Sequence, residues 1–382
     1  SLDHDLEECA DAYSDSSDYI HVETDPLVLL DNSDKLIRHF EQNPFVPSDA
    51  VTVDERCEEV FKIQTAGLAK RIEHVHAKTV VVGISGGLDS TLALLVCVEA
   101  FKLLGRDMSG IIAVTMPGFG TTGKTYTNAL TIMKLLGTTV REVPIGDAVM
   151  QHFAAIGHNP EVHDVTYENC QARERTQILM DIANETGGLV IGTGDLSESA
   201  LGWSTYNGDH MSMYAVNVSV PKTLVKFVVG WVADHKISEA SKDDPYSADD
   251  ITLAATLHDI MDTPISPELL PPDSSGNIVQ KTEERVGPYI LHDFFLFYTM
   301  RYGMRPEKLF YIACQTFEGM FDRSFVKKWL REFYRRFFMQ QYKRSCIPDG
   351  PKVGTVTLSP RGDWRMPSDA DSSEWLAEVD SL

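Results

Sequence analysis

The sequence predicts an α/β fold, a doubly wound parallel sheet with a helical C-terminal extension. Short apolar segments rich in Val and Ile alternate with longer segments of helical periodicity, an order typical of a parallel sheet covered by helices on both faces. A glycine-rich loop follows the first apolar segment, as expected where a strand of such a sheet passes into a helix. Beyond residue 220 the pattern is mostly helical, so we expect the sheet in the first part of the chain.

The predicted elements begin with an amphipathic helix over residues 54–73, whose apolar side carries Val60, Ile63, Leu68 and Ile72. In a parallel sheet the ligand lies at the C-terminal ends of the strands, so residues just after each strand are site candidates. Strands are expected over 79–84, 110–116, 139–145 and 189–193, and helices over 90–104, 124–136, 147–156 and 167–186.

The second part of the chain is predicted to be helical. Pro221 suits the first turn of one helix, and Ser247 followed by two aspartates suits the start of another. Segment 262–287 is rich in Pro, Ser and Gly, so we expect a long loop there, placed to act as a lid. Further helices are expected over 288–302, 306–318 and 323–341. We therefore divide the chain into an acidic tail or linker over 1–45, a main domain over 46–345 and an irregular tail over 346–382.

Charge and composition narrow the class of protein. The formal net charge of −22 comes mostly from residues 1–34, with eleven acids, and 366–382, with five, and neither stretch has Lys or Arg. The centre is nearly balanced, which allows an anionic small substrate but argues against broad nucleic-acid binding. No apolar run reaches the ~18 residues that span a bilayer, and the N-terminus has no signal-peptide core. Six cysteines without metal-ligand spacing indicate reduced thiols, so we expect a cytoplasmic protein without a membrane partner.

The most informative motif is the loop Ser85–Ser90, which reads Ser-Gly-Gly-Leu-Asp-Ser. Backbone N–H groups and the helix dipole attract an anion at a helix N-terminus, and two glycines allow a phosphate to approach. Ser85 and Ser90 add hydroxyl donors. Asp89 repels a phosphate unless a metal ion lies between them, so the loop predicts a pyrophosphate bound together with Mg²⁺. The alternative is a tight strand-to-helix turn without a ligand.

A second phosphate-binding pattern, GxxxxGK[ST], covers Gly118–Thr125. A P-loop NTPase that uses this segment is therefore an alternative. Pro117 interrupts the entry from the strand, and the companion acid of a P-loop enzyme would have to end another strand, where Asp195 is the best candidate. We prefer the interpretation in which this segment borders a nucleotide, with Met116 against the adenine and Lys124 in solvent.

Downstream motifs narrow the prediction further. The Ser-Gly-Gly-x-Asp-Ser loop resembles the pyrophosphate-binding loop of ATP pyrophosphatases, which have an adenine nucleotide α-hydrolase-like fold. The order and spacing of the other motifs resemble NAD synthetase, specifically the synthetase portion of the bacterial glutamine-dependent enzyme, over roughly residues 43–368. These motifs are Asn43–Pro47, Tyr167–Arg175, Gly192–Glu198, Gly202–Asp209, Val220–Thr223, Ile265–Pro271, Gln280–Glu283, Gly287–Asp293 and Ser359–Trp364.

The resemblance implies an ATP-dependent amidation. Deamido-NAD, ATP and ammonia would give NAD, AMP and pyrophosphate, because the nicotinate carboxylate attacks the α-phosphate and ammonia then displaces AMP from the NAD-adenylate. Phosphoryl transfer of this kind needs positioning and charge neutralisation more than covalent help from the protein.

The resemblance also implies roles for particular residues. Asp89, Glu198 and Lys222 would be catalytic, and the two acids would hold Mg²⁺. Other interpretations are a helix-capping role for Glu198, a surface ion pair for Arg173 and a core position for Trp203. For ATP we expect Ser85, Gly86, Gly87, Asp89, Ser90, Met116, Thr193, Lys222 and Ser266. For deamido-NAD we expect Asn169, Arg173, Trp203, Tyr206, Asp209 and Lys343.

Two further expectations follow from the resemblance. The glutamine-dependent enzyme carries an N-terminal glutaminase domain, for which this chain has no room, so we expect residues 1–42 to be its remnant and free ammonia to be the nitrogen donor. Members of the family bind deamido-NAD across a subunit interface, so we expect a homo-oligomer. Another ATP pyrophosphatase that amidates a different acceptor, and a nucleotide-binding regulatory module without turnover, remain alternatives.

Overall fold

The computed structural model describes residues 38–121, 123–237, 248–264, 269–270 and 282–382. By its internal contacts the chain divides into two units, Ser1–His39 and Phe40–Leu382, and every element below belongs to the second unit. Within the described residues, no helix combines the length and the apolar character needed to cross a bilayer.

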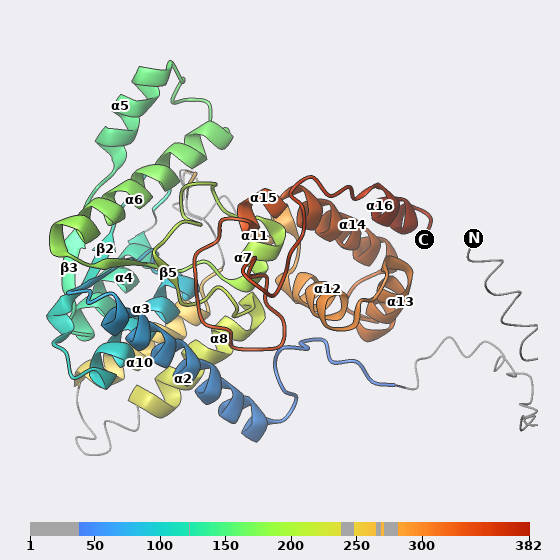
Figure 1. The fold of residues 1–382 in the computed structure, drawn as a ribbon, viewed down its shortest axis with the longest axis horizontal. Helices are drawn as coiled ribbons and strands as arrows, with labels where there is room; N and C mark the ends of the chain where they lie inside the picture. Colours follow the sequence, from blue (N-terminus) through green and yellow to red (C-terminus); the bar gives the residue numbers. More distant parts are fainter. Residues whose placement is uncertain (1–37, 122, 238–247, 265–268, 271–281) are drawn as a thin grey trace, which may run out of the picture. The chain divides into compact units, whose positions relative to one another are not determined.

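A five-stranded parallel sheet forms the centre of the second unit (Figure 1). Its strand order is β3-β2-β1-β4-β5, and Val80 in β1 pairs with Ile111 on one side and Leu189 on the other. The chain builds outward from β1 to β3 and then returns to the other side of β1 with β4. The sheet is therefore doubly wound, as the sequence predicts. The strands are β1 (Val80–Gly83), β2 (Ile111–Thr115), β3 (Thr139–Glu142), β4 (Leu189–Gly192) and β5 (Tyr214–Ala215).

Successive side chains of the central strand pack into two separate apolar clusters, one on each face of the sheet. Val80 and Val82 belong to one apolar cluster, and Val81 belongs to the other. Because strand side chains point to opposite faces in turn, a continuous β-branched run fits a strand that is buried on both faces. The first cluster is covered by α2 (Ala50–His74), α3 (Leu88–Leu103), α4 (Gly123–Leu135), α8 (Lys222–Trp231) and α10 (Ala248–Met261), and the second by α5 (Gly146–Ile156) and α6 (Val165–Thr186).

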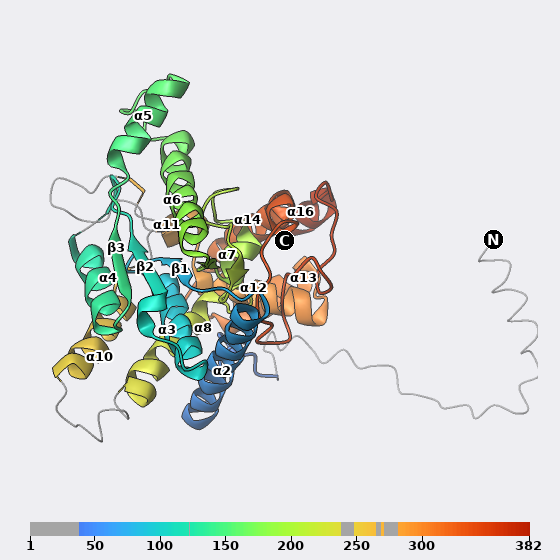
Figure 2. The same ribbon diagram turned by 60° about the vertical axis from the view of Figure 1, so that its left-hand side comes forward.

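The C-terminal helices pack beside the sheet layers (Figure 2). Aromatic side chains pack between these helices. Phe294 and Phe317 meet edge to face with ring centroids 5.2 Å apart, and Phe333 lies 5.8 Å from Phe295. The expected helical extension is thus present. Its helices are α11 (Thr282–Val286), α12 (Tyr289–Tyr302), α13 (Pro306–Thr316), α14 (Arg323–Met339), α15 (Gln341–Arg344) and α16 (Ser373–Asp380).

The structure differs from the prediction in three elements. Strand β5 has only two residues, too few for a recognisable alternating pattern. The segment expected as one loop over 262–287 contains α11, although most of that segment lies outside the described residues, so the expected lid does too. The tail expected to be irregular over 346–382 contains α16, whose Glu378 binds Arg305 at 2.6 Å.

Candidate active site

The candidate site lies at the carboxyl ends of β1 and β4. These two strands are neighbours in the sheet. The chain continues from β1 toward β2 on one side and from β4 toward β5 on the other. Their carboxyl ends therefore border the crevice where ligands bind in such sheets. The loop Ser85–Gly87 follows β1, and Thr193 follows β4. Helix α7 (Leu196–Leu201) and the start of α8 complete the surroundings of this crevice.

The glycine loop after β1 is shaped by a close backbone contact. Gly86 has φ +85°, and a Cβ atom there would overlap the carbonyl oxygen of Thr125 at the start of α4. Only glycine fits this conformation and this approach. Gly87 is the N-cap of α3 and provides no side-chain cap for the helix, so the first N–H groups of α3 are not capped by that residue.

The two serines of the loop contact each other and the loop backbone. The hydroxyls of Ser85 and Ser90 lie 3.1 Å apart, and the Gly87 N–H donates to Ser85 Oγ at 3.2 Å. Ser90 is buried, whereas Ser85 is exposed. The structure therefore brings together the four small residues predicted to hold phosphates.

Lys222 lies at the centre of a cluster of three carboxylates. Its Nζ is 2.6 Å from Asp89 Oδ2, 2.9 Å from Asp195 Oδ2 and 2.9 Å from Glu198 Oε1. The lysine side chain is 2% exposed and that of Asp195 is 0% exposed, while Asp89 and Glu198 are each 22% exposed. The predicted catalytic residues Asp89, Glu198 and Lys222 thus meet, although they come from three different helices.

Burial and mutual repulsion change the protonation of these groups. Burial raises the pKa of Glu198 to about 7, and the neighbouring Asp89 carboxylate adds to the rise. Burial also raises the pKa of Asp195 well above its ordinary value. For Lys222, burial opposes the charged form, but the three carboxylates together outweigh it and hold the lysine pKa well above the ordinary value. Lys222 therefore stays a cation at neutral pH.

Sequence reasoning did not place Asp195 in this cluster, although it named Asp195 as the companion acid of the P-loop alternative. This residue is the N-cap of α7 and forms a capping box with Glu198, in which each side chain accepts from the other residue's backbone N–H. Glu198 therefore has the helix-capping role that was expected as an alternative, and it also contacts Lys222. The signal was in the sequence: an acid directly after a strand, three residues before a second acid, marks both a cap and a pair of clustered carboxylates.

The three carboxylates have the donor set that a magnesium ion prefers. One oxygen from each of Asp89, Asp195 and Glu198 lies within 4.8 Å of the others. Asp89 Oδ1 is buried and has no hydrogen-bond partner in the structure, so it is available to a cation. Mg²⁺ binds carboxylate oxygens and shares its remaining positions with water and phosphates. The residues present therefore fit the ion that the glycine loop predicts.

A buried amide fixes the two strand ends relative to each other. Asn217 Nδ2 donates to the backbone carbonyls of Asp89 at 2.9 Å and Thr193 at 3.1 Å, and its own oxygen accepts from Gln64 Nε2 at 3.0 Å. Both amide residues are 0% exposed. Thr193 thus lies beside the site as predicted, through its backbone. A single Asn in a loop gives no sequence signal for this role.

A second group of predicted residues assembles between α6 and the loop over 202–209. Thr205 Oγ1 donates to Asn169 Oδ1 at 2.6 Å, and Arg173 Nε donates to the Tyr206 carbonyl at 3.3 Å. The Thr205 N–H donates to Asp209 Oδ1 at 2.7 Å. The residues expected to contact deamido-NAD therefore lie together, and Arg173 binds the loop backbone in place of the expected alternative, a surface ion pair.

The remaining predicted contacts have mixed outcomes. Lys343 Nζ donates to the carbonyls of Gly202 and Ser204 at 2.8 and 2.6 Å, so in the structure it supports the loop. The Arg336 guanidinium lies 5.3 Å from the ring of Trp203, and Tyr206 is 44% exposed. Met116 is buried in the second apolar cluster. Ser266 lies outside the described residues.

The lysine of the P-loop pattern, Lys124, forms an ion pair with an aspartate of another helix. Lys124 Nζ lies 2.8 Å from Asp259 Oδ1 of α10, and both side chains are about half exposed. The segment contacts the glycine loop through the Thr125 backbone, as noted above. Its expected position beside the nucleotide loop fits this contact, whereas the P-loop alternative would need Lys124 to face the phosphates.

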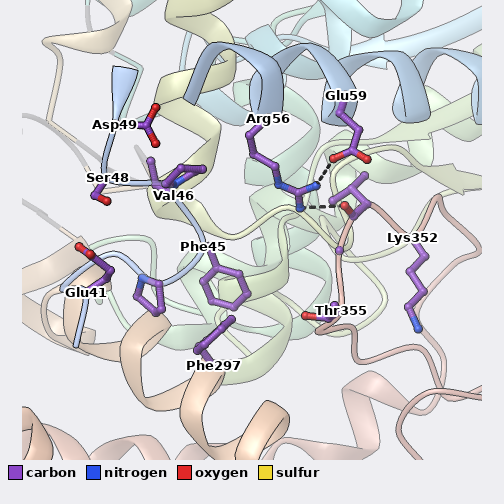
Figure 3. Close-up of a pocket in the computed structure, with 14 residues that line it drawn as sticks. Glu41, Phe45, Val46, Ser48, Asp49, Arg56, Glu59, Phe297, Lys352 and Thr355 are labelled. Carbon is purple, nitrogen blue, oxygen red and sulfur yellow. Dashed lines mark hydrogen bonds and ion pairs between the residues drawn. The ribbon is translucent and has the colours of Figure 1, made fainter. Parts of the chain in front are cut away.

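A separate hollow of about 760 Å³ lies away from these residues (Figure 3). Phe45 and Phe297 meet edge to face at 5.0 Å on one side of it. On the other side Arg56 donates to Glu59 at 2.7 Å and to the Val353 carbonyl at 2.8 Å. None of its lining residues belongs to the carboxylate cluster, and its arginine is already paired within the protein, so we place the chemistry at the cluster.

The chain is similar to known NAD synthases and NAD(+) synthetases. The family model described as NAD synthase matches residues 60–239. The glutamine-dependent NAD(+) synthetase of Mycobacterium tuberculosis is 42% identical over 373 residues, 90% of this chain and 52% of that protein. The enzyme of the same name from Mycobacterium leprae is 42% identical over 368 residues, with the same coverage. The chain thus spans about half the length of these curated relatives.

The fold has a solved counterpart as well. A glutamine-dependent NAD(+) synthetase from Cytophaga hutchinsonii superposes with a TM-score of 0.67 at 18% identity, over 85% of this chain and 56% of that one. The predicted parallel-sheet α/β fold is therefore confirmed. The segment that matches the NAD synthase model, residues 60–239, contains the glycine loop, α7 and the start of α8.

Proposed function

We propose that the chain catalyses the ATP-dependent amidation of deamido-NAD to NAD, a ligase reaction that forms a C–N bond and releases AMP and pyrophosphate. The observation that carries the proposal is the contact of Lys222 with three carboxylates directly beside the glycine loop. It is supported by the match of residues 60–239 to the NAD synthase model and by the names of the relatives. We propose that the synthetase domain spans residues 46–345, between the two tails.

The chain's own groups match the needs of adenylation. In the proposed reaction, Ser85, Gly86, Gly87 and Ser90 bind the β and γ phosphates through hydroxyl and N–H donors. The Lys222 ammonium balances the charge that moves onto the departing pyrophosphate. Asp89, Asp195 and Glu198 would hold Mg²⁺, which supplies further neutralisation of phosphate charge when bound. Thr193 and Met116 remain proposed ATP contacts, and Ser266 remains one by its motif alone.

Deamido-NAD would bind between α6 and the 202–209 loop. Asn169 and Arg173 already fix that loop, and Asp209 holds its Thr205 N–H. We propose that Trp203 or the exposed Tyr206 stacks on the pyridine ring, and that Lys343 contacts the dinucleotide from beside the loop. The nicotinate carboxylate attacks the α-phosphate, and ammonia then attacks the resulting NAD-adenylate and expels AMP.

Ammonia is the proposed nitrogen donor for this chain. The relatives are named glutamine-dependent and are about twice as long, so in the whole protein a glutaminase region would supply the ammonia. We further propose a cytoplasmic location, because the five described cysteines are free and four of them are buried, as suits a reducing compartment.

We also propose a homo-oligomer. The arm formed by α5 and the start of α6 projects from the sheet layers, and both views show it (Figures 1 and 2). It exposes Met150, Ile156, Val162 and Val165, the last at 66%. Exposed apolar side chains along this arm fit a contact with a second copy. Sedimentation of the wild type at a monomer mass, with full activity, would contradict this proposal.

The nucleotide product tests the proposed reaction. With ATP, Mg²⁺, deamido-NAD and ammonium, we expect AMP and NAD in equal amounts, and we expect D89N to lower AMP formation by about 100-fold or more, because it removes one charge from the cluster. K124A is the matched control and should retain activity, since Lys124 pairs with Asp259. Release of ADP would favour a P-loop NTPase. AMP formation with xanthosine monophosphate or aspartate in place of deamido-NAD would favour another ATP pyrophosphatase that amidates a different acceptor.

A further inference from the structure

We infer that two residues of helix α12, which lies outside the segment matched by the family model, position Lys222 from its backbone side and from its ammonium side. This inference rests on the proposed function and extends it to two positioning residues, Asp293 and Tyr289. They are four positions apart on α12, so they share one face of the helix, and that face meets the start of α8.

Asp293 binds Thr223, the residue after Lys222, and reaches the Lys222 backbone through Ser197. Its Oδ2 accepts from the N–H of Thr223 at 3.0 Å and from the Thr223 hydroxyl at 2.7 Å. Its Oδ1 accepts a short hydrogen bond from the hydroxyl of Ser197, and that hydroxyl in turn accepts from the Lys222 N–H at 2.8 Å. Asp293 is 1% exposed. One buried carboxylate therefore links α7 to the first turn of α8.

This carboxylate replaces a cap that α8 itself lacks. The N-cap of α8 is Pro221, which has no side-chain hydrogen bond to the helix. The first N–H groups of a helix need partners, and a carboxylate is the most favourable one at that end. Asp293 supplies it from another helix. Because Lys222 is the first residue of α8, the position of the cap sets the position of the lysine.

Tyr289 lies against the other end of the lysine. The Lys222 Nζ is 5.4 Å from the centre of the Tyr289 ring, within the range of a cation–π contact. Tyr289 is 2% exposed, so its ring is a buried neighbour of the ammonium beside the three carboxylates. With its backbone N–H bound by Ser197, which Asp293 holds, and its ammonium against the Tyr289 ring, the lysine has little freedom to leave the carboxylates.

Steady-state kinetics of D293N tests this role. The amide keeps the shape of Asp293 but cannot accept from donors on both sides, so the start of α8 shifts and Lys222 moves with it. We expect kcat for AMP formation to fall by about tenfold or more, with the KM values for ATP and deamido-NAD changed by less than about threefold. Y289L should lower kcat more than Y289F, which keeps the ring.

T299V is the matched control, because Thr299 is also on α12 and makes a side-chain contact of 3.3 Å with the hydroxyl of Tyr334, away from Lys222. It should lower stability but keep kcat. S197A provides a milder interruption of the same path if D293N does not fold, and it should lower kcat as well. A folded D293N or S197A with kcat within twofold of the wild type, or a T299V with the same loss, would overturn the inference.

Hydrogen exchange separates this inference from the proposed function. In the absence of substrates, the amides at the start of α8 should exchange at least about tenfold faster in D293N than in the wild type or T299V, because their acceptor is weakened. If the wild type makes no AMP, the proposed function is wrong, yet the exchange rates still decide whether Asp293 holds α8. Equal exchange in D293N and the wild type overturns the inference.

Discussion

His292 has the most clearly defined titration outside the candidate site. It is 1% exposed, and burial lowers its pKa to about 4 while its ring contacts the Val286 carbonyl at 2.6 Å. In the unfolded chain His292 becomes protonated near pH 6.5, whereas in the folded chain it becomes protonated only near pH 4. Stability from this residue is complete above pH 6.5 and is lost as the pH falls toward 4, by about 3 kcal/mol at most.

Urea unfolding between pH 4.5 and 7.5 measures this effect. We expect H292Q to have a flatter dependence of unfolding free energy on pH than the wild type, because glutamine does not titrate. H152Q is the control, since His152 is exposed, and it should follow the wild-type curve. Identical slopes for H292Q and the wild type would show that His292 does not titrate as its burial requires.

Single residues also mark what the sequence could and could not reveal. The small residues of the glycine loop could be predicted, and so could the charged residues Asp89, Glu198 and Lys222. Each of them lies in a short motif with its own chemistry. Asn217 and Asp293 act through contacts to residues far away along the chain, and no local pattern signals such a contact. The ammonium of Lys343 binds two loop carbonyls, a contact that only tertiary packing determines, and its predicted contact with the dinucleotide stays a prediction.

At the scale of elements, a glycine in each of the two candidate phosphate loops can be tested by substitution: Gly86 in the loop Ser85–Ser90 and Gly123 in the P-loop pattern. Gly86 has a positive φ and no room for a Cβ, whereas a Cβ on Gly123 would meet no atom within 4 Å. We expect G86A to lower kcat/KM for ATP by about tenfold or more and to lower stability by about 1–3 kcal/mol, through strain in the loop. G123A should change kcat/KM by less than twofold.

Matched kinetics and thermal unfolding of the two glycine variants test this comparison. A loss of ATP turnover in G123A, with G86A unaffected, would mean that Gly118–Thr125 holds the phosphates. The outcome therefore bears on the choice between the two loops without requiring a bound structure.

Element existence was more predictable than element ends. The strands were recognisable because buried parallel strands are β-branched runs, and α6 because Asp164 caps its start and Gly187 ends it with φ +64°. Helix α2 begins at Ala50, four residues before the predicted start, because Asp49 accepts from the Thr52 N–H. Short elements such as β5 and α11 form only because tertiary neighbours complete them.

For the whole molecule, the carboxylate cluster connects three separate elements, α3, α7 and α8. A cation bound there would stabilise the native state of the entire unit, because it binds the folded chain and not the unfolded one. We expect Mg²⁺ at about 100 times its dissociation constant to add about 2.7 kcal/mol to the free energy of unfolding.

Thermal unfolding in EDTA and in Mg²⁺ checks this prediction. The shift in Tm should be present in the wild type and in T299V, and strongly reduced in E198Q and D195N. A shift of equal size in all four proteins would place the ion elsewhere.

The strand order has a further consequence for the folding of the chain. Strand β1 pairs with β2 across about thirty residues, but its pairing with β4 joins Val80 to Leu189 across more than a hundred. Closing so long a loop has a large entropic cost, so we expect the β1–β4 pairing to form late. Asp89 lies just beyond β1, while Asp195, Glu198 and Lys222 follow β4, so the four charges meet only when that pairing is complete. The acids therefore come together only when the lysine is also in place, so we expect the candidate site to be among the last parts of a newly synthesised chain to form.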